Sequence, residues 1–182
     1  RLVAASTAAG SEAALDFGLQ FRLAAGWKTY WRYPGEAGAA PRLNWSGSEN
    51  VAAIAVAWPA PQRLSAFGFD NFGYEKELVL PLRVTPQSPG RPVKLTLQLD
   101  YLVCSDICVP GAAALTLALP AGAAATSEFA PLIGQYRARV PLSGEASPFQ
   151  FSEVRLSGAP GDEVLELQAA GAEPFQAPDL LV

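Results

Sequence analysis

The sequence predicts an all-β protein, an immunoglobulin-like antiparallel β-sandwich followed by a short linker helix and the start of a second β domain. Apolar residues recur at every second position over several short segments, and glycine and proline separate these segments. A helical period of apolar residues appears near residue 130. Half of the 182 residues are apolar, so the chain can bury a sizeable core. This pattern is typical of two sheets that each present one face to a shared core.

Four segments have the two-residue period of a half-buried strand. The four segments are 15–23, 78–84, 95–103 and 115–119. In the first of them, the odd-numbered residues are apolar, whereas Asp16, Gln20 and Arg22 occupy even positions. Turn-rich stretches such as Pro86 to Pro92 connect them.

After the last of these segments the period becomes helical. The helical stripe consists of Phe129, Leu132, Ile133, Tyr136 and Val140. We expect Ser127 to be the N-cap, Glu128 and Pro131 to lie in the first turn, and the helix to end near Pro141.

The chain is therefore expected to have three parts. Beyond the helix, 154–156 and 164–167 have the pattern of strands, but about forty residues cannot close a sandwich. The parts are an immunoglobulin-like domain with the cysteine pair at 11–122, a helical linker at 123–141 and a partial second β domain at 142–182.

The two cysteines, Cys104 and Cys108, are separated by three residues at the end of a predicted strand. A disulfide across so short a loop removes only about 2 kcal/mol of unfolded-state conformational free energy, so stability does not explain the pair. A strained or exposed disulfide is easily reduced. The spacing therefore favours thiol-disulfide chemistry; a structural disulfide or two inert core thiols are the alternatives.

Strand parity predicts where Cys104 points. The residues that share its parity are Lys94, Thr96, Gln98 and Asp100. If the strand stays regular, Cys104 lies off the core face and is accessible. The alternative is that the strand ends or bulges before Cys104 and the pair packs inward. We expect Pro110-Gly111 to turn the chain into the next strand.

The loop between the cysteines offers no cation. Ser105, Asp106 and Ile107 are neutral or acidic, so they do not lower a thiol pKa. Asp106, as a site neighbour, disfavours a thiolate. A slow nucleophile is the expected consequence.

Composition excludes several classes of function. Thirteen basic and seventeen acidic residues, with a pI near 4.8, leave no basic patch for nucleic acid or a membrane surface. The chain has no histidine, which removes the usual general base and zinc ligand. No metal site and no cofactor are expected. Because methionine is also absent, we expect an excised or mature piece of a longer protein, which could carry membrane segments.

Several motifs resemble one family. They are Trp27-Lys-Thr-Tyr-Trp-Arg-Tyr-Pro-Gly-Glu-Ala-Gly, Trp58-Pro-Ala-Pro, Phe69-Asp-Asn-Phe-Gly-Tyr and Tyr101-Leu-Val-Cys-Ser-Asp-Ile-Cys-Val-Pro. Over roughly Leu15 to Pro120 the chain resembles the N-terminal periplasmic domain of the DsbD thiol:disulfide interchange proteins, most closely the ScsB (suppressor of copper sensitivity) branch. The spacing of the cysteines departs from the family, because DsbD-type domains have a longer insert between them.

The resemblance implies a protein-disulfide reductase that works in the periplasm as the soluble domain of an inner-membrane protein. A thioredoxin-like domain of the same longer protein would supply electrons, and periplasmic thioredoxin-fold or peroxidase-linked proteins would accept them. It also implies that Cys108 forms the mixed disulfide with a partner and that Cys104 resolves it. The reversible disulfide would need no cofactor.

The aromatic segment 67–74 resembles the cap loop that shields the cysteines in this family. Phe72 is the nearest match, Phe67 and Phe69 are also possible, and Asp70 and Tyr74 belong to the same segment. Four aromatics among glycines suit a hinged apolar lid. The alternative is an aromatic turn that packs into the sandwich.

A second aromatic cluster precedes Pro34-Gly35. For Tyr30 and Tyr33, a place beside the cysteines and a place in the core are equally compatible with the alternation, whereas Trp31 is expected in the core.

Two other functions compete with the redox relay. A β-sandwich binding module would use exposed aromatics as a flat platform and would keep a permanent disulfide. A copper(I)-binding protein would use the two thiolates, without help from methionine or histidine.

Overall fold

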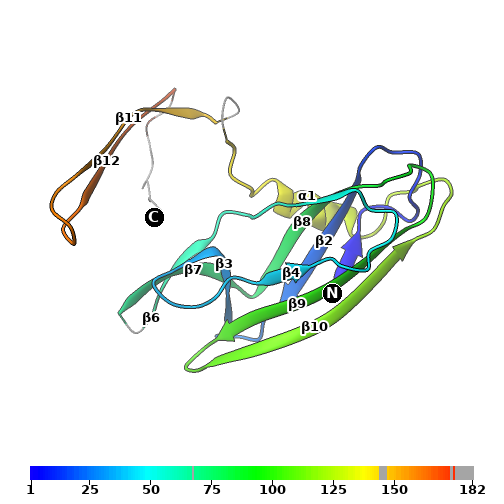
Figure 1. Ribbon diagram of the computed structural model, residues 1–182, viewed down its shortest axis with the longest axis horizontal. Coiled ribbons are helices and arrows are strands. Elements are labelled where there is room, and N and C mark those ends of the chain that lie inside the picture. Colours follow the sequence, from blue (N-terminus) through cyan, green and yellow to red (C-terminus); the bar gives the residue numbers. More distant parts are fainter. Residues whose placement is uncertain (67, 144–146, 173, 175–182) are drawn as a thin grey trace. The chain divides into compact units, whose positions relative to one another are not determined.

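The computed structural model describes residues 1–66, 68–143, 147–172 and 174 (Figure 1). Its strands are β1 (Leu2–Ala4), β2 (Leu15–Arg22), β3 (Lys28–Gly35), β4 (Arg42–Asn44), β5 (Ala53–Val56), β6 (Gln62–Ala66), β7 (Phe69–Glu75), β8 (Glu77–Thr85), β9 (Val93–Cys104), β10 (Cys108–Leu119), β11 (Phe149–Ser157) and β12 (Val164–Gly171), and the helix is α1 (Ala130–Arg137). The chain divides into two compact units, Arg1–Val140 and Pro141–Val182.

The first unit is an antiparallel β-sandwich, as the sequence predicts. One sheet has the order β1-β2-β8-β5, and the other has the order β10-β9-β3-β7-β6, with β4 also paired to β9. All of these pairings are antiparallel. The prediction of an immunoglobulin-like all-β fold is confirmed.

The core lies between the two sheets and follows the predicted alternation. Phe17 and Leu19 of β2 lie opposite Leu82 and Leu80 of β8, and all four are fully buried. The second sheet adds Leu95 and Leu97 of β9. Because side chains alternate between faces, the residues between these positions face away from the core.

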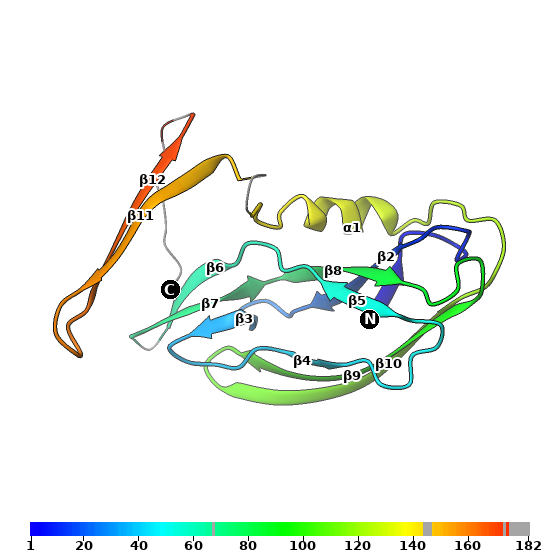
Figure 2. The ribbon, with the colours of Figure 1, turned by 45° about the horizontal axis from the view of Figure 1, so that its top comes forward.

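Helix α1 covers the outer face of the first sheet, on the side away from β9 and β10 (Figure 2). Ile133 is 2% exposed and packs over Gly18, where a Cβ would approach its side chain to 3.2 Å. The Tyr136 hydroxyl donates to the Glu77 carbonyl at 2.8 Å. The helix is thus a packed layer of the first unit, whereas the sequence led us to expect a linker.

The start of the helix differs from the expectation. Phe129, not Ser127, is the N-cap, and no side chain caps it. Ser127 Oγ accepts a hydrogen bond from Phe129 N at 3.1 Å and donates to the Ala4 carbonyl. The serine therefore ties the helix to β1, a long-range role that a local sequence pattern does not reveal.

The N-terminal ten residues belong to the sandwich, although the predicted domain begins at residue 11. Strand β1 pairs with β2 through Leu2↔Leu19 and Ala4↔Phe17. Three apolar residues in a row give no alternating signal, because both faces of this strand are buried.

The expected turn at Pro110-Gly111 is wrong. The chain reverses at 105–107, and β10 begins at Cys108. Pro110 fits inside β10 because this strand is the edge of its sheet, where a missing N–H costs little. Gly111 lies opposite Tyr101, and a Cβ there would be 2.5 Å from the tyrosine ring.

The second unit contains the hairpin β11–β12, at the predicted strands but longer than expected. Its described side chains are largely exposed, including Phe151, Val154 and Leu156. A two-stranded hairpin alone is marginally stable in water. In the described part of the chain, no helix is long and apolar enough to cross a membrane.

The packing of α1 gives a stability prediction. We expect Ile133→Ala to lower the free energy of unfolding by about 2–5 kcal/mol, because it opens a cavity against Gly18 and Val79. Urea denaturation measures this change. The control is Gly134→Ala on the exposed side of the helix, where a new Cβ meets nothing within 4 Å. This control should raise the free energy of unfolding by about 0.5–1 kcal/mol, because alanine favours a helix more than glycine does. An Ile133→Ala variant of unchanged stability would contradict the packing of α1 on the sheet.

Candidate functional site

The two cysteines face each other at the turn of the β9–β10 hairpin. Cys104 ends β9, Cys108 begins β10, and the two residues are register partners with Cα atoms 4.1 Å apart. They form a disulfide. Ser105 N donates to the Ile107 carbonyl at 2.9 Å and closes the turn between them.

The two sulfur-bearing residues differ sharply in exposure. Cys104 is 1% exposed, whereas Cys108 is exposed, as are its neighbours Ile107 and Val109. An incoming thiolate or disulfide from solvent therefore meets Cys108 first.

Tyr30 of β3 buries Cys104. Its hydroxyl donates to Cys104 Sγ at 3.0 Å and lies 4.0 Å from Cys108 Sγ. The side chain is 3% exposed, and burial raises the pKa of its phenol, so it stays a protonated donor at neutral pH. Of the two predicted sites for Tyr30, the structure places it beside the cysteines.

The expectation that Cys104 is accessible is wrong, because Tyr30 covers it. The strand is regular and Cys104 does have the parity opposite to the core leucines. However, the outer face of the sheet is covered at this point by a side chain that is 74 residues away in sequence.

A short loop at residues 35–38 packs on Tyr30. Gly38 has a φ of 99°, and a Cβ there would be 2.2 Å from the Tyr30 ring. The loop is held to β7 because Glu36 N donates to the Asp70 carbonyl at 3.0 Å and Ala37 N donates to Asn71 Oδ1 at 3.0 Å. Its Pro-Gly-x-x-Gly pattern is visible in the sequence, but its contact with the site is not.

Lys28 is a site neighbour that sequence reasoning missed. In the pairing of β3 with β9, Lys28 lies directly opposite Cys104. The loop between the cysteines offers no cation, whereas β3 brings one to the position opposite Cys104. No local signal could have found it, because only the strand register brings the two residues together.

The aromatic segment 67–74 is mostly strand. Phe67 lies outside the described residues, and Phe69 to Glu75 form β7, which β3 separates from β9. Phe72 and Tyr74 are buried; Arg63 lies over the Phe72 ring and the Tyr74 hydroxyl donates to the Pro59 carbonyl. Phe69 is 48% exposed.

This placement agrees with the alternative that the segment packs into the sandwich. Asp70 pairs with Arg63 at 2.6 Å and also holds the 35–38 loop through its carbonyl. A shielding role for Phe72 stays a prediction.

The remaining predicted neighbours lie at the surface or in the core. Tyr33 is 65% exposed and meets the Trp31 ring edge-on at 5.6 Å, while Arg32 lies over both rings. Trp31 packs against the core as expected. Asp106 is exposed in the turn. The Trp31 and Tyr33 rings are thus nearly perpendicular to each other and do not form a flat platform.

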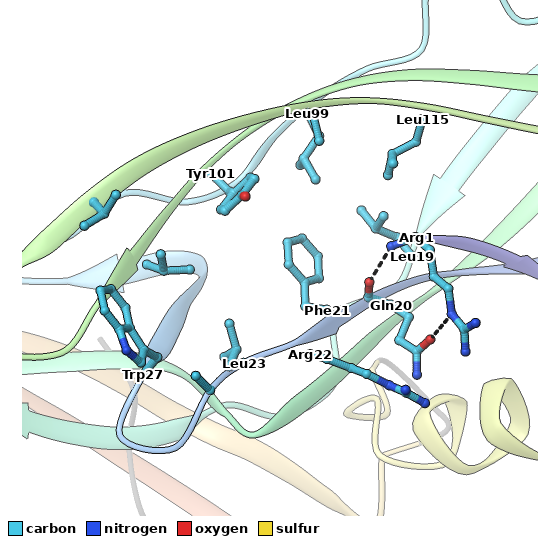
Figure 3. Close-up of a pocket in the computed structure, with 14 residues that line it drawn as sticks. Arg1, Leu19, Gln20, Phe21, Arg22, Leu23, Trp27, Leu99, Tyr101 and Leu115 are labelled. Carbon is cyan, nitrogen blue, oxygen red and sulfur yellow. Dashed lines mark hydrogen bonds between the residues drawn. The ribbon is translucent and has the colours of Figure 1, made fainter.

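A cavity of about 420 Å³ lies between the sheets (Figure 3). Phe21 and Leu23 point into it from one sheet, and Leu99 and Tyr101 from the other (Figure 3). Val103 and Val109, the register pair next to the cysteines, also line it. The disulfide and Tyr30 therefore occupy the outer face of the second sheet, and the cavity occupies the inner face.

The described ranges contain no group of three or more cysteine or acidic residues arranged to hold a metal ion. Beside the cysteines, the structure places the Tyr30 hydroxyl, and the strand register places Lys28 opposite Cys104.

Comparison with known proteins shows the family of the first unit. The family model described as thiol:disulfide interchange protein DsbD, N-terminal, matches residues 1–120. Among solved structures, the chain is similar to the N-terminal periplasmic domain of ScsB from Proteus mirabilis, with 32% sequence identity and a TM-score of 0.67. That match covers 90% of this chain but 62% of that chain, so this chain spans less than two thirds of its length. No curated protein sequence matches the chain.

The Tyr30 hydroxyl gives a redox prediction. A hydrogen bond to a thiolate is stronger than one to a disulfide sulfur, so Tyr30→Phe should disfavour the reduced form. At a fixed glutathione ratio we expect the ratio of reduced to oxidised protein to fall about tenfold, as measured by mass after alkylation. Tyr33→Phe is the matched control, because Tyr33 is exposed and should leave the ratio unchanged. An equal ratio in Tyr30→Phe and the native protein would contradict this role.

Proposed function

The chain belongs to the family of DsbD N-terminal domains and carries the cysteine pair of a thiol:disulfide interchange domain, and from this premise we propose that it relays reducing equivalents to partner proteins in the periplasm. The observation that carries the proposal is the difference in exposure between Cys108 and Cys104. This difference supports successive roles for the two sulfurs, with Cys108 reacting first and Cys104 second.

In the first step, the Cys108 thiolate attacks a disulfide of the partner. The partner disulfide breaks, one partner sulfur leaves as a thiolate, and the other forms a mixed disulfide with Cys108. Cys108 takes this role because it is exposed at the start of an edge strand, between the exposed side chains of Ile107 and Val109.

In the second step, the Cys104 thiolate attacks Cys108 Sγ. The Cys104–Cys108 disulfide forms, and the second partner sulfur leaves as a thiolate that takes up a proton. Two electrons have then passed from the domain to the partner, and the register that places Cys104 opposite Cys108 keeps the resolving sulfur within reach. The buried position of Cys104 prevents it from competing for the partner.

The cycle closes when an electron donor reduces the domain again. We propose the thioredoxin-like domain of the same longer, membrane-embedded protein as that donor. Thioredoxin-fold or peroxidase-linked periplasmic proteins are the proposed acceptors. The chemistry uses the cysteine pair alone, without a cofactor, and the activity is that of a protein-disulfide reductase.

A redox titration tests whether the disulfide is a carrier. We expect a reversible midpoint between about −180 and −270 mV in graded glutathione buffers, the range of catalytic dithiols. Alkylation and mass measurement give the reduced fraction at each ratio. A midpoint below about −300 mV would make the bond structural and would favour the binding-module function instead.

Single-cysteine variants test the assignment of the two sulfurs. Reduced Cys104→Ser, mixed with an oxidised thioredoxin-fold protein, should accumulate a mixed disulfide, because Cys108 attacks and nothing resolves the product. Cys108→Ser should form none and should abolish transfer. Non-reducing electrophoresis separates the two results, and the double variant is the control. Full transfer by Cys108→Ser would overturn the proposal.

A further inference from the structure

A row of three residues crosses the outer face of the second sheet at the disulfide. Cys104 of β9 lies opposite Lys28 of β3, and Lys28 lies opposite Glu75 of β7. Directly opposed residues of an antiparallel pair have Cβ atoms about 4.5–5.5 Å apart, within reach of a lysine side chain. The Tyr30 hydroxyl, 3.0 Å from Cys104 Sγ, comes from the same strand as Lys28, two residues on.

Lys28 is not engaged elsewhere. Among the residues that the structure describes, it forms no ion pair within 4.0 Å, whereas Lys94 on β9 pairs with Glu49 at 2.7 Å. Lys28 is also half-buried, so water screens its charge less than it screens that of a fully exposed lysine.

The second step of the proposed exchange needs such a cation. Cys104 must be a thiolate to attack Cys108 Sγ, yet burial favours the neutral thiol. Tyr30 offers one neutral hydrogen bond. A positive charge beside the sulfur compensates for the lost hydration of the thiolate.

We propose that Lys28 is a positioning residue that stabilises the Cys104 thiolate and thereby sets the rate at which the mixed disulfide is resolved. This inference deepens the proposed function and rests on it. Lys28 keeps its proton throughout, so it transfers no proton to or from the reacting sulfurs. Its positive charge acts by stabilising the negative charge of the Cys104 thiolate.

None of the other charged residues described near Cys104 lies directly opposite it in the sheet. Glu75 lies beyond Lys28, and Asp106 is exposed in the turn. Asp100 precedes Cys104 by four residues on β9 and lies opposite Arg42 of β4. Glu36 of the 35–38 loop accepts a hydrogen bond from Asp70 N. From β10, no ionisable residue other than Cys108 adjoins Cys104.

The test measures the pKa of Cys104 directly. In a Cys108→Ser background, Cys104 is the single thiol, and the ultraviolet absorbance of its thiolate is recorded against pH. We expect Lys28→Gln to raise the pKa of this thiol and thereby to lower the thiolate fraction at neutral pH about tenfold. Lys28→Arg should restore the native profile, because it keeps the charge, and a merely structural lysine would not show this rescue.

Two further variants complete the design. Lys94→Gln removes an equally positive charge from the same outer parity but from a lysine that is already paired, and it should leave the pKa of Cys104 unchanged. Glu75→Gln removes the negative charge that lies opposite Lys28 in the sheet, so it should lower the pKa of Cys104. This variant keeps the test decisive if Lys28→Gln does not fold. An unchanged pKa in Lys28→Gln, or a raised pKa in Glu75→Gln, overturns the proposal.

Resolution of the mixed disulfide provides the second readout. In the intact cysteine pair, Lys28→Gln should let the mixed disulfide with an oxidised thioredoxin-fold protein persist about tenfold longer, while its first formation by Cys108 is unchanged. The titration needs no partner. A raised pKa in Lys28→Gln without any exchange would therefore overturn the relay, while the stabilisation of the Cys104 thiolate by Lys28 would stand. Normal exchange by Lys28→Gln with an unchanged pKa of Cys104 would overturn the role of Lys28 and leave the relay intact.

Discussion

Strand β9 is paired with β10 along one edge and with β4 and β3 along the other. The two cysteines, Lys28 and Tyr30 take their positions from these pairings. The β10 register places Cys108 opposite Cys104, and the β3 register brings Lys28 and Tyr30 to the same face. A shift of one residue in either pairing would move these side chains to the cavity side of the sheet. The buried leucines of β9 resist such a shift, because it would expose them. The core therefore fixes the geometry of the sulfur site on the opposite face.

The contrast between the two sulfurs comes from a single covering layer. Tyr30 lies on Cys104, and the 35–38 loop lies on Tyr30 and is fastened to β7. Cys108, across the hairpin, has no such cover. The two sulfurs of the disulfide are chemically equivalent, but only Cys108 is accessible from solvent. Burial alone can therefore set the order of the two proposed exchange steps, without any difference in intrinsic reactivity between the thiols.

The alternating patterns of β2, β8 and β9 were sufficient to predict the sandwich, because a half-buried strand alternates apolar and polar residues along the sequence. The spacing of the cysteines pointed to the pair that the structure joins in a disulfide. The parity of Cys104 was also right, but its burial depends on Tyr30, which arrives by strand pairing from a distant segment. Lys28, the packing of α1 and the contact of Ser127 with Ala4 share this long-range origin. Local periodicity predicts the face of the sheet to which a side chain points. It does not predict which distant segment of the chain covers that face.

The β9–β10 hairpin is made of neighbouring segments, whereas its cover comes from far along the chain. The cysteines have a sequence separation of 4, and Tyr30 is 74 residues from Cys104. Contacts between nearby residues have a low entropic cost of loop closure and form rapidly, and long-range strand pairing forms later. While this domain folds, the hairpin can therefore bring the two thiols together before β3 docks beside them. The cover over Cys104 is made by Tyr30 of β3, so the difference in access between the two sulfurs depends on the long-range pairing of β3 with β9.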